Sequence, residues 1–158
     1  MKFRVEPMSL RHYRAVYRLW RASEGVGLSD ADSRPNLALY LKRNPGMSLV
    51  ARTGKRIIGA VLSGHDGRRG YLHHLAVTRR YRRHGVGRAL VDACLARLAG
   101  CGIQKCNIFV YADHHRGRAF WQHSGWARRN DLRLMQKPTP AAGAARPKRS
   151  GTARDDRH

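Results

Sequence analysis

The chain has 158 residues, which fits one domain of ordinary size and leaves little room for a second. Its 32 basic side chains outnumber the 10 acidic ones and give a formal net charge of +22, a field that attracts polyanions such as nucleic acid, an acidic partner or a phosphate-rich cofactor. Neither an export segment at the N-terminus nor an apolar stretch of bilayer-spanning length is present, so the sequence predicts a cytoplasmic protein without a membrane anchor.

Two features of the composition leave alternatives open. Of the basic residues 26 are Arg and 6 are Lys, a skew that GC-rich codon usage explains as well as a polyanion partner does. Cys94, Cys101 and Cys106 lack Cys-x-x-Cys spacing, which favours reduced thiols. A Cys101–Cys106 bridge remains an alternative.

The first half of the chain predicts a strand, two helices and a hairpin. Residues 2–6 alternate as a strand does, and Ser9 caps a helix over residues 10–22. A second, shorter helix opens at Ser33 and ends at residues 44–46. The apolar face of the first helix recurs at steps of three and four: Leu10, Tyr13, Val16, Tyr17 and Trp20. Two further strand patterns form a hairpin: residues 47–52 and 56–63.

The second half predicts a mixed α/β arrangement. A strand over residues 71–77 precedes a helix over 86–99, which Gly100 and Gly102 end. The remaining elements follow in chain order: a strand over 104–111, a helix over 116–123 and a last strand over 132–136. The hairpins require antiparallel neighbours, so most of the sheet is expected to be antiparallel.

Two glycines stand where the strand over 71–77 gives way to the helix over 86–99. The first turn of a helix carries backbone N–H groups without internal partners and the positive end of the helix dipole. Glycine removes the Cβ atoms that would keep a bulky diphosphate away from such amides. The segment therefore predicts a pyrophosphate site: Arg82, Arg83, His84, Gly85, Val86, Gly87 and Arg88. Neither a Walker loop nor a dinucleotide fingerprint is present.

This segment resembles the acetyl-CoA motif of the GNAT superfamily of N-acetyltransferases, (Arg/Gln)-x-x-Gly-x-(Gly/Ala). The likeness runs from Phe3 to about Lys137 and includes residues 120–126, which are similar to the family's Phe-Tyr-x-x-x-Gly-Phe. It is closer to bacterial YpeA-type members, on Leu19-Trp20, residues 64–70 and residues 74–77.

The resemblance implies a sheet splayed between the strands over 71–77 and 104–111, flanked by helices. Acetyl-CoA would lie in the splay, with its pantothenate bonded to the backbone of Leu75, Ala76 and Val77. Its pyrophosphate would sit on Arg83 to Arg88. His114 replaces a frequent cofactor-binding Asn of the family.

Acetyl transfer to an amine needs a neutral amine, a polarised thioester carbonyl and a protonated leaving thiolate. The Val77 N–H is the candidate for polarising the carbonyl. A tyrosine usually protonates the thiolate in the family, but Trp121 stands there and its indole is a very poor acid. Tyr111, His114 and water remain as candidates, and so does transfer without a dedicated acid.

His74 and His73 are the candidates for the base, since histidine titrates near neutral pH. Neighbours on a strand alternate between its faces, so only one is expected to face a given side, and His74 is preferred because it lies in the matched segment. A structural, hydrogen-bonded histidine is the competing interpretation. The His pairs at 73–74 and 114–115 lack zinc-site spacing, so no metal is expected.

An acidic segment and a basic tail complete the predictions. Glu24, Asp30 and Asp32 either line an acceptor wall for a cationic amine or form a solvated loop. Residues 1–137 are expected to form the acetyltransferase domain and residues 138–158 a disordered basic tail. The sequence thus predicts an acetyl-CoA-dependent N-acetyltransferase, monomeric or homodimeric, whose acceptor it does not identify. A nucleic-acid- or ribosome-associated protein and a non-catalytic acyl-CoA sensor are the alternatives.

Overall fold

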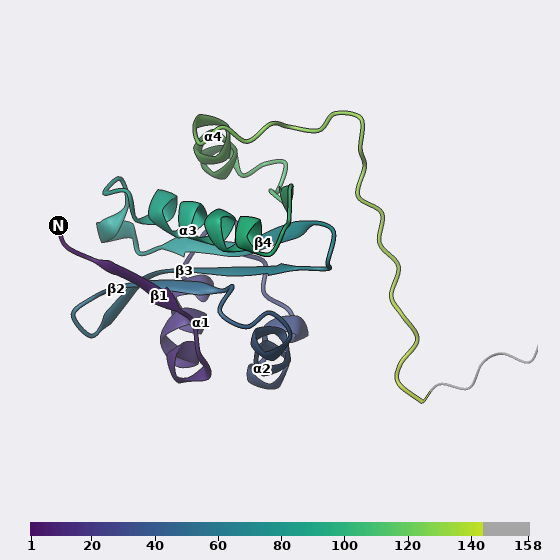
Figure 1. Cartoon of the computed structure of the whole chain (residues 1–158), viewed down its shortest axis with the longest axis horizontal. Helices are drawn as coiled ribbons and strands as arrows, with labels where there is room; N and C mark the ends of the chain where they lie inside the picture. Colours follow the sequence, from purple (N-terminus) through teal and green to yellow (C-terminus); the bar gives the residue numbers. More distant parts are fainter. Residues whose placement is uncertain (144–158) are drawn as a thin grey trace, which may run out of the picture. The chain divides into compact units, whose positions relative to one another are not determined.

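One five-stranded sheet organises the chain, and the computed structural model describes it within residues 1–143 (Figure 1). The strands follow their chain order across the sheet: β1 (Arg4–Pro7), β2 (Leu49–Thr53), β3 (Arg56–His65), β4 (Gly70–Val77) and β5 (Cys106–Ile108). The first three pairings are antiparallel and the β4–β5 pairing is parallel. The expected mixed, mostly antiparallel sheet is confirmed.

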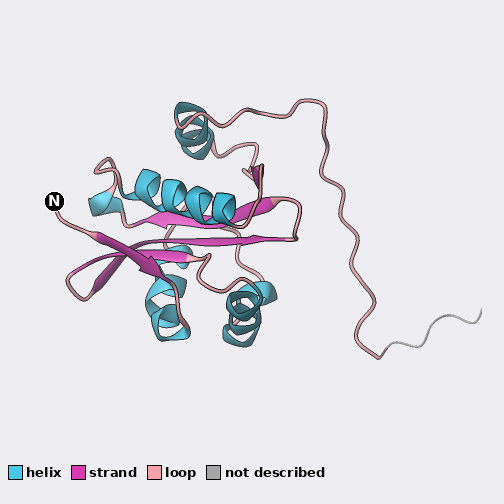
Figure 2. Cartoon of the chain, viewed as in Figure 1, coloured by secondary structure: helices cyan, strands magenta, loops and turns pink. Residues whose placement is uncertain are grey.

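Helices cover both faces of this sheet. Figures 1 and 2 show α1 and α2 on one face and α3 on the other, with α4 beyond α3. Their bounds are α1 (Tyr13–Arg21), α2 (Arg34–Arg43), α3 (Val86–Gly100) and α4 (His115–His123). Three short 3-10 segments join them: η1 (Leu10–His12), η2 (Asp30–Asp32) and η3 (Arg79–Tyr81). No helix among the described residues is both long and apolar enough to cross a membrane.

The alternation of the strands divides the core into two layers. Val50, Ala60 and Leu62 pack against α1 and α2, where Trp20 is fully buried. The other layer packs on α3 through Leu49, Ile58, Val61 and Leu72. Five residues of α3 are buried at helical spacing: Val86, Leu90, Val91, Cys94 and Leu98. Burial of each Val or Leu side chain among them contributes roughly 1.5–3 kcal/mol.

β4 contains one residue more than the stretch of β3 opposite it. Ala60 lies opposite Ala76 but Leu62 lies opposite His73, so the register shifts between them. The extra residue is His74, whose φ of 55° lies in the left-handed region. His73 shares the face of Leu62, and the ring of His74 lies 5.1 Å from that of Trp20, on the same face. The expectation that the two histidines face opposite sides is wrong, because the bulge interrupts the alternation.

The pairing of β5 with β4 is short. It runs from Gly70 to Leu72 and stops, although β4 continues to Val77. The two strands therefore part beyond Leu72, which confirms the expected splay. The strand expected over residues 104–111 is shorter than predicted for the same reason, since only Cys106–Ile108 has a partner.

One predicted strand does not form. Residues 132–136 alternate as a strand does, yet residues 127–143 contain neither helix nor strand, and Leu132, Leu134 and Met135 are exposed. The expectation was wrong because alternation describes a strand's faces and supplies no hydrogen-bonded neighbour. Met1–Trp126 forms one compact unit, and a second begins at Ala127. The division at residue 137 stays a prediction, and most of the expected disordered tail, residues 144–158, lies outside the described residues.

Candidate functional site

The loop between β4 and α3 holds two residues in the left-handed conformation. Arg83 has a φ of 62°, and Gly85, which caps α3, has a φ of 79°. Glycine adopts this conformation without the steric cost that a Cβ brings, which explains Gly85. The side chain of Arg82 anchors the loop, because its Nε donates to the Val77 carbonyl at 3.0 Å. Its guanidinium is thus tied to β4.

The backbone amides of this loop are free to bind a ligand. In the part of the chain that the structure describes, the first α3 amide with an acceptor is that of Ala89, which donates to the Gly85 carbonyl at 2.9 Å. The N–H groups from Arg83 to Arg88 have no protein acceptor there. Free amides beside left-handed residues at a helix N-terminus form a concavity that suits an anion.

The charged side chains around these amides differ in their freedom. Arg83 and His84 are exposed. Arg88 is exposed too, and its Nε lies 3.9 Å from the Asp92 carboxylate one turn along the helix, a contact that water screens. Gly87 faces α4, where an added Cβ would lie 3.4 Å from the Phe120 ring. The first turn of α3 is therefore covered by α4 on one side and lined with guanidinium groups.

The open edge of β4 presents one amide of interest. The Thr78 N–H donates to the Ile58 carbonyl at 2.8 Å, so Thr78 directs its polar backbone groups toward β3. Successive residues of an antiparallel strand direct these groups to opposite edges, so the Val77 N–H points to the edge that β5 leaves. Leu75 packs toward α3 and Ala76 toward α1. Leu75 therefore offers a ligand in the splay its backbone rather than its side chain, whereas Ala76, which pairs with Ala60, directs its polar backbone groups toward β3.

Tyr111 and His114 lie against the loop between α1 and α2. A Cβ added at Gly27 would overlap the Tyr111 hydroxyl, and one added at Gly25 or Gly117 would overlap the His114 ring. These glycines thus permit a close approach that larger residues would prevent. Tyr111 as a residue remains 58% exposed, although its hydroxyl lies against Gly27.

His74 forms a buried pair with Asp32 of η2. The Nε2 of His74 lies 2.7 Å from Asp32 Oδ1, with side-chain exposures of 18% and 6%. Asp32 Oδ2 accepts the Ser29 N–H at 3.0 Å, and the Tyr13 hydroxyl donates to the Asp32 carbonyl at 3.0 Å. Both carboxylate oxygens are therefore occupied. The solvated-loop interpretation is wrong for Asp32, whereas Glu24 and Asp30 are exposed.

His73 belongs to an aromatic group on the same face of the sheet. Its ring centroid lies 6.2 Å from that of Tyr71 and 6.3 Å from that of Phe109. Burial lowers the pKa of His73; the neighbouring His74 lowers it further, and Asp32 opposes both effects. The surroundings of His73 thus favour its neutral form over the imidazolium.

Trp121, the cysteines and the histidine pairs are the remaining residues singled out from the sequence. Trp121 packs edge-on against Phe120 and Trp126, with centroids 5.1 and 5.0 Å away. All three cysteines carry free thiols. Within residues 1–143, no group of three or more His, Cys, Asp or Glu side chains is placed to hold a metal.

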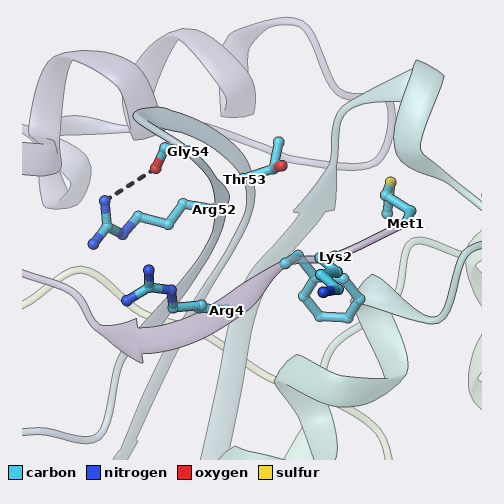
Figure 3. Close-up of a pocket in the computed structure, with 7 residues that line it drawn as sticks. Met1, Lys2, Arg4, Arg52, Thr53 and Gly54 are labelled. Atoms are coloured by element: carbon cyan, nitrogen blue, oxygen red, sulfur yellow. Dashed lines mark hydrogen bonds between the residues drawn. The ribbon is translucent and has the colours of Figure 1, made fainter.

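A separate pocket lies at the β1–β2 edge of the sheet (Figure 3). Lys2, Arg4 and Arg52 line it together with Met1, Phe3, Thr53 and Gly54. Arg4 lies opposite Arg52 in the strand pair, and Figure 3 shows both side chains extending in the same direction. None of the site residues predicted from the sequence lines this pocket.

Comparison with known proteins gives consistent matches. The model of the Acetyltransferase (GNAT) family matches residues 13–126. An acetyltransferase of Sodalis glossinidius is 26% identical over 106 residues, which cover 67% of this chain and 75% of that protein. An acetyltransferase of Yersinia pestis is 34% identical over 83 residues, 52% of this chain and 59% of that protein, so the match spans about three fifths of that relative's length.

A solved structure has a similar fold. Ard1 from Thermoplasma volcanium superimposes with a TM-score of 0.72 at 20% identity, covering 80% of this chain and 84% of that one. At this identity the likeness concerns the fold alone. The finer resemblance to YpeA-type proteins stays a prediction.

Proposed function

Because the chain belongs to the GNAT family of acetyltransferases, we propose that it transfers an acetyl group from acetyl-CoA to a primary amine of a small molecule or a protein. One observation carries the proposal. The edge of β4 that β5 leaves open leads directly into a loop of six successive amides, Arg83 to Arg88, which have no protein acceptor within residues 1–143. A thioester with a diphosphate at its far end needs both features, a gap for the pantetheine and an anion site beyond it.

The residues fit acetyl-CoA as follows. The free amides from Arg83 to Arg88 bind the pyrophosphate, with guanidinium charge from Arg83 and Arg88. Arg82 holds the loop on β4 through the Val77 carbonyl. The backbone of Leu75 to Val77 borders the pantothenate. His114 lines the cofactor from the α4 side. The ring of His114 lies close against Gly25 and Gly117, which have no Cβ to displace it.

The chemistry then needs three proton or charge movements. His74 accepts the proton that the amine nitrogen loses as it attacks the carbonyl carbon. Asp32 holds the Nε2–H of His74, which leaves Nδ1 as the accepting atom, and its carboxylate stabilises the imidazolium that forms. The Val77 N–H donates to the carbonyl oxygen as negative charge develops there.

The third movement is protonation of the leaving sulfur. Trp121 is unsuited, because it packs between Phe120 and Trp126 and its indole is a very poor acid. Tyr111 is the donor we propose, since its hydroxyl lies against Gly27 and the residue is 58% exposed. The cytoplasmic location and the oligomeric state stay predictions.

Binding of acetyl-CoA is tested with two substitutions at one position. Gly85→Asn and Gly85→Asp are nearly isosteric and share the cost of the left-handed conformation. Only Asp places a carboxylate at the diphosphate site. By calorimetry we expect Gly85→Asp to bind acetyl-CoA at least ~10-fold more weakly than Gly85→Asn, a difference of about 1.4 kcal/mol. Equal affinities, or no binding by the wild type at millimolar acetyl-CoA, would refute the site.

Catalysis is tested separately. A screen of small amines and basic peptides with acetyl-CoA, followed by thiol release and by mass detection of the acetylated product, identifies the acceptor. Binding without any product would instead support an acyl-CoA sensor, the alternative that the replacement of the family tyrosine by Trp121 favours.

A further inference from the structure

The exposed side of η1 and α1 is a ridge of arginines. Arg11, Arg14, Arg18 and Arg21 are all exposed and follow one another at steps of three, four and three residues. A helix rises 1.5 Å per residue, so these steps space the side chains roughly 4.5–6 Å apart along one side. Within residues 1–143, no carboxylate pairs with any of the four. Like charges at these steps weaken a helix, so the ridge does not stabilise the fold.

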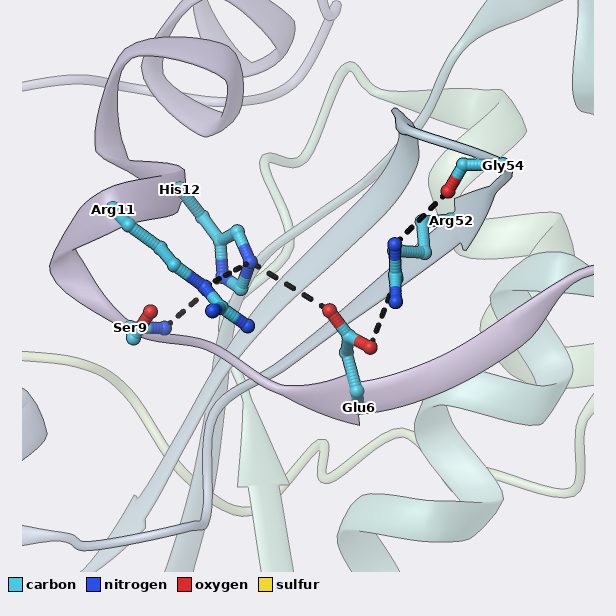
Figure 4. A network of polar contacts seen from close by, with 6 residues as sticks. All are labelled: Glu6, Ser9, Arg11, His12, Arg52 and Gly54. Carbon is cyan, nitrogen blue, oxygen red and sulfur yellow. Dashed lines mark hydrogen bonds and ion pairs between the residues drawn. The ribbon is translucent and has the colours of Figure 1, made fainter.

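The ridge is connected to the pocket at the β1–β2 edge. Figure 4 shows the link: Arg11 contacts His12, whose Nε2 lies 3.6 Å from Glu6, and Glu6 accepts from Arg52 Nε at 2.9 Å. In that pocket Arg4 and Arg52 face each other across the strand pair. Like charges directly opposite destabilise a strand pair. Seven basic residues thus line one continuous track, with Glu6 as the carboxylate between its two parts: Lys2, Arg4, Arg11, Arg14, Arg18, Arg21 and Arg52.

We propose that this track binds the phosphate backbone of a nucleic acid. Regularly spaced cations suit a polymer that carries one charge per monomer better than a small anion, which two or three of them would satisfy. Six of the seven are Arg, whose planar fork binds phosphate oxygens through two parallel hydrogen bonds. The track presents no sequence-reading motif, so the binding is independent of base sequence.

A membrane surface is a poorer match for the same track. An interfacial helix inserts the apolar side chains beside its charges into the membrane. The apolar side of α1 instead packs in the protein core, where Val16, Leu19 and Trp20 are buried. An acidic protein would present carboxylates in an irregular pattern. Competition between polyglutamate and unlabelled duplex distinguishes this partner from a nucleic acid. None of the residues proposed for acetyl transfer belongs to the track, so the two activities can be tested independently.

The experiment compares two variants of equal charge. The triple variant R14Q/R18Q/R21Q removes three cations from the ridge. The matched control R43Q/R56Q/R68Q removes three exposed arginines elsewhere, whose side chains make no hydrogen bond or ion pair within the described residues. Binding of a short fluorescein-labelled DNA duplex of random sequence and of a labelled RNA hairpin is followed by anisotropy over a range of salt concentrations. Thermal melting verifies that both variants are folded.

We expect the slope of log Kd against log salt to fall by about 3 in the ridge variant, one for each lost phosphate contact, and to change little in the control. Equal weakening in both variants would show diffuse attraction by net charge and would overturn the proposal. So would the absence of binding at low salt, or competition by polyglutamate as effective as that by unlabelled duplex at equal charge.

Discussion

The Asp32–His74 pair gives the sharpest test of the proposed chemistry, through the substitution Asp32→Asn. Asp32 uses one carboxylate oxygen for the His74 ring and the other for the Ser29 N–H. An asparagine has a single oxygen, and the Ser29 N–H, which has no other acceptor in the described part of the chain, requires it. The NH2 group then faces His74 Nε2 and donates to it. This arrangement stabilises the tautomer with its proton on Nδ1, which is unable to accept a proton from the amine.

The size of the effect follows from this tautomer change. Loss of a general base costs typically 10²–10⁴-fold in rate, so we expect kcat of Asp32→Asn to fall at least ~100-fold. The KM for acetyl-CoA should not change, because among the described residues Asp32 makes no hydrogen bond or ion pair with the diphosphate loop. Thiol release with the acceptor from the amine screen measures both quantities. His74→Gln should show a loss of the same order, because the two residues act as a unit.

Asp30→Asn is the matched control for this substitution. Asp30 lies in the same segment, η2, but it is exposed, and among residues 1–143 its carboxylate has a single hydrogen-bond partner, Asn36. It should retain full activity. A kcat for folded Asp32→Asn within about threefold of the wild type, far below the general-base range, would show that His74 is not the base.

Three further substitutions or conditions test other parts of the structure. Gly27→Ala should lower kcat about as much as Tyr111→Phe, on the order of 100-fold, because the new Cβ displaces the Tyr111 hydroxyl. Gly100→Ala is its control, because a Cβ added at Gly100 has open space among the described residues. A fully active Gly27→Ala would contradict the role of Tyr111. Leu90→Ala should cost about 2–5 kcal/mol in urea unfolding, since Leu90 is fully buried between α3 and the sheet. Folding stability should decline as the pH falls below about 6.5, because burial lowers the pKa of His73 and the unfolded chain then binds the proton more readily. In urea titrations His73→Gln should flatten this decline of the free energy of unfolding with falling pH. An unchanged slope against pH would argue against this effect of His73.

Local patterns in the sequence predicted where the loop before α3 lies and where α3 begins, whereas anion binding there stays a prediction. The loop from Arg82 to Arg88 joins a strand to the helix that follows it, and a helix N-terminus has free amides wherever it occurs. Gly85 in the left-handed conformation is likewise a local property. The order of the elements then implied the mixed sheet, because short hairpin turns leave no choice but antiparallel neighbours.

Contacts between distant segments could not be predicted in this way. Asp32 and His74 are 42 residues apart, and neither residue type shows from its neighbours that it pairs with the other. The bulge at His74 was missed because two consecutive histidines occur equally well in a regular strand and in a bulged one. The strand expected over residues 132–136 illustrates the opposite error, in which a suitable local pattern has no partner strand.

The extra residue in β4 also determines which amides the strand offers to a ligand. Because the bulge absorbs the extra residue, Ala76 lies opposite Ala60 and Val77 lies opposite Gly59, where the Val77 N–H points away from β3. A regular strand that continued from the His73–Leu62 pair without a bulge would place Val77 opposite Ile58 and turn its N–H toward β3. The bulge thus determines that the Val77 N–H is the backbone donor that the splay exposes.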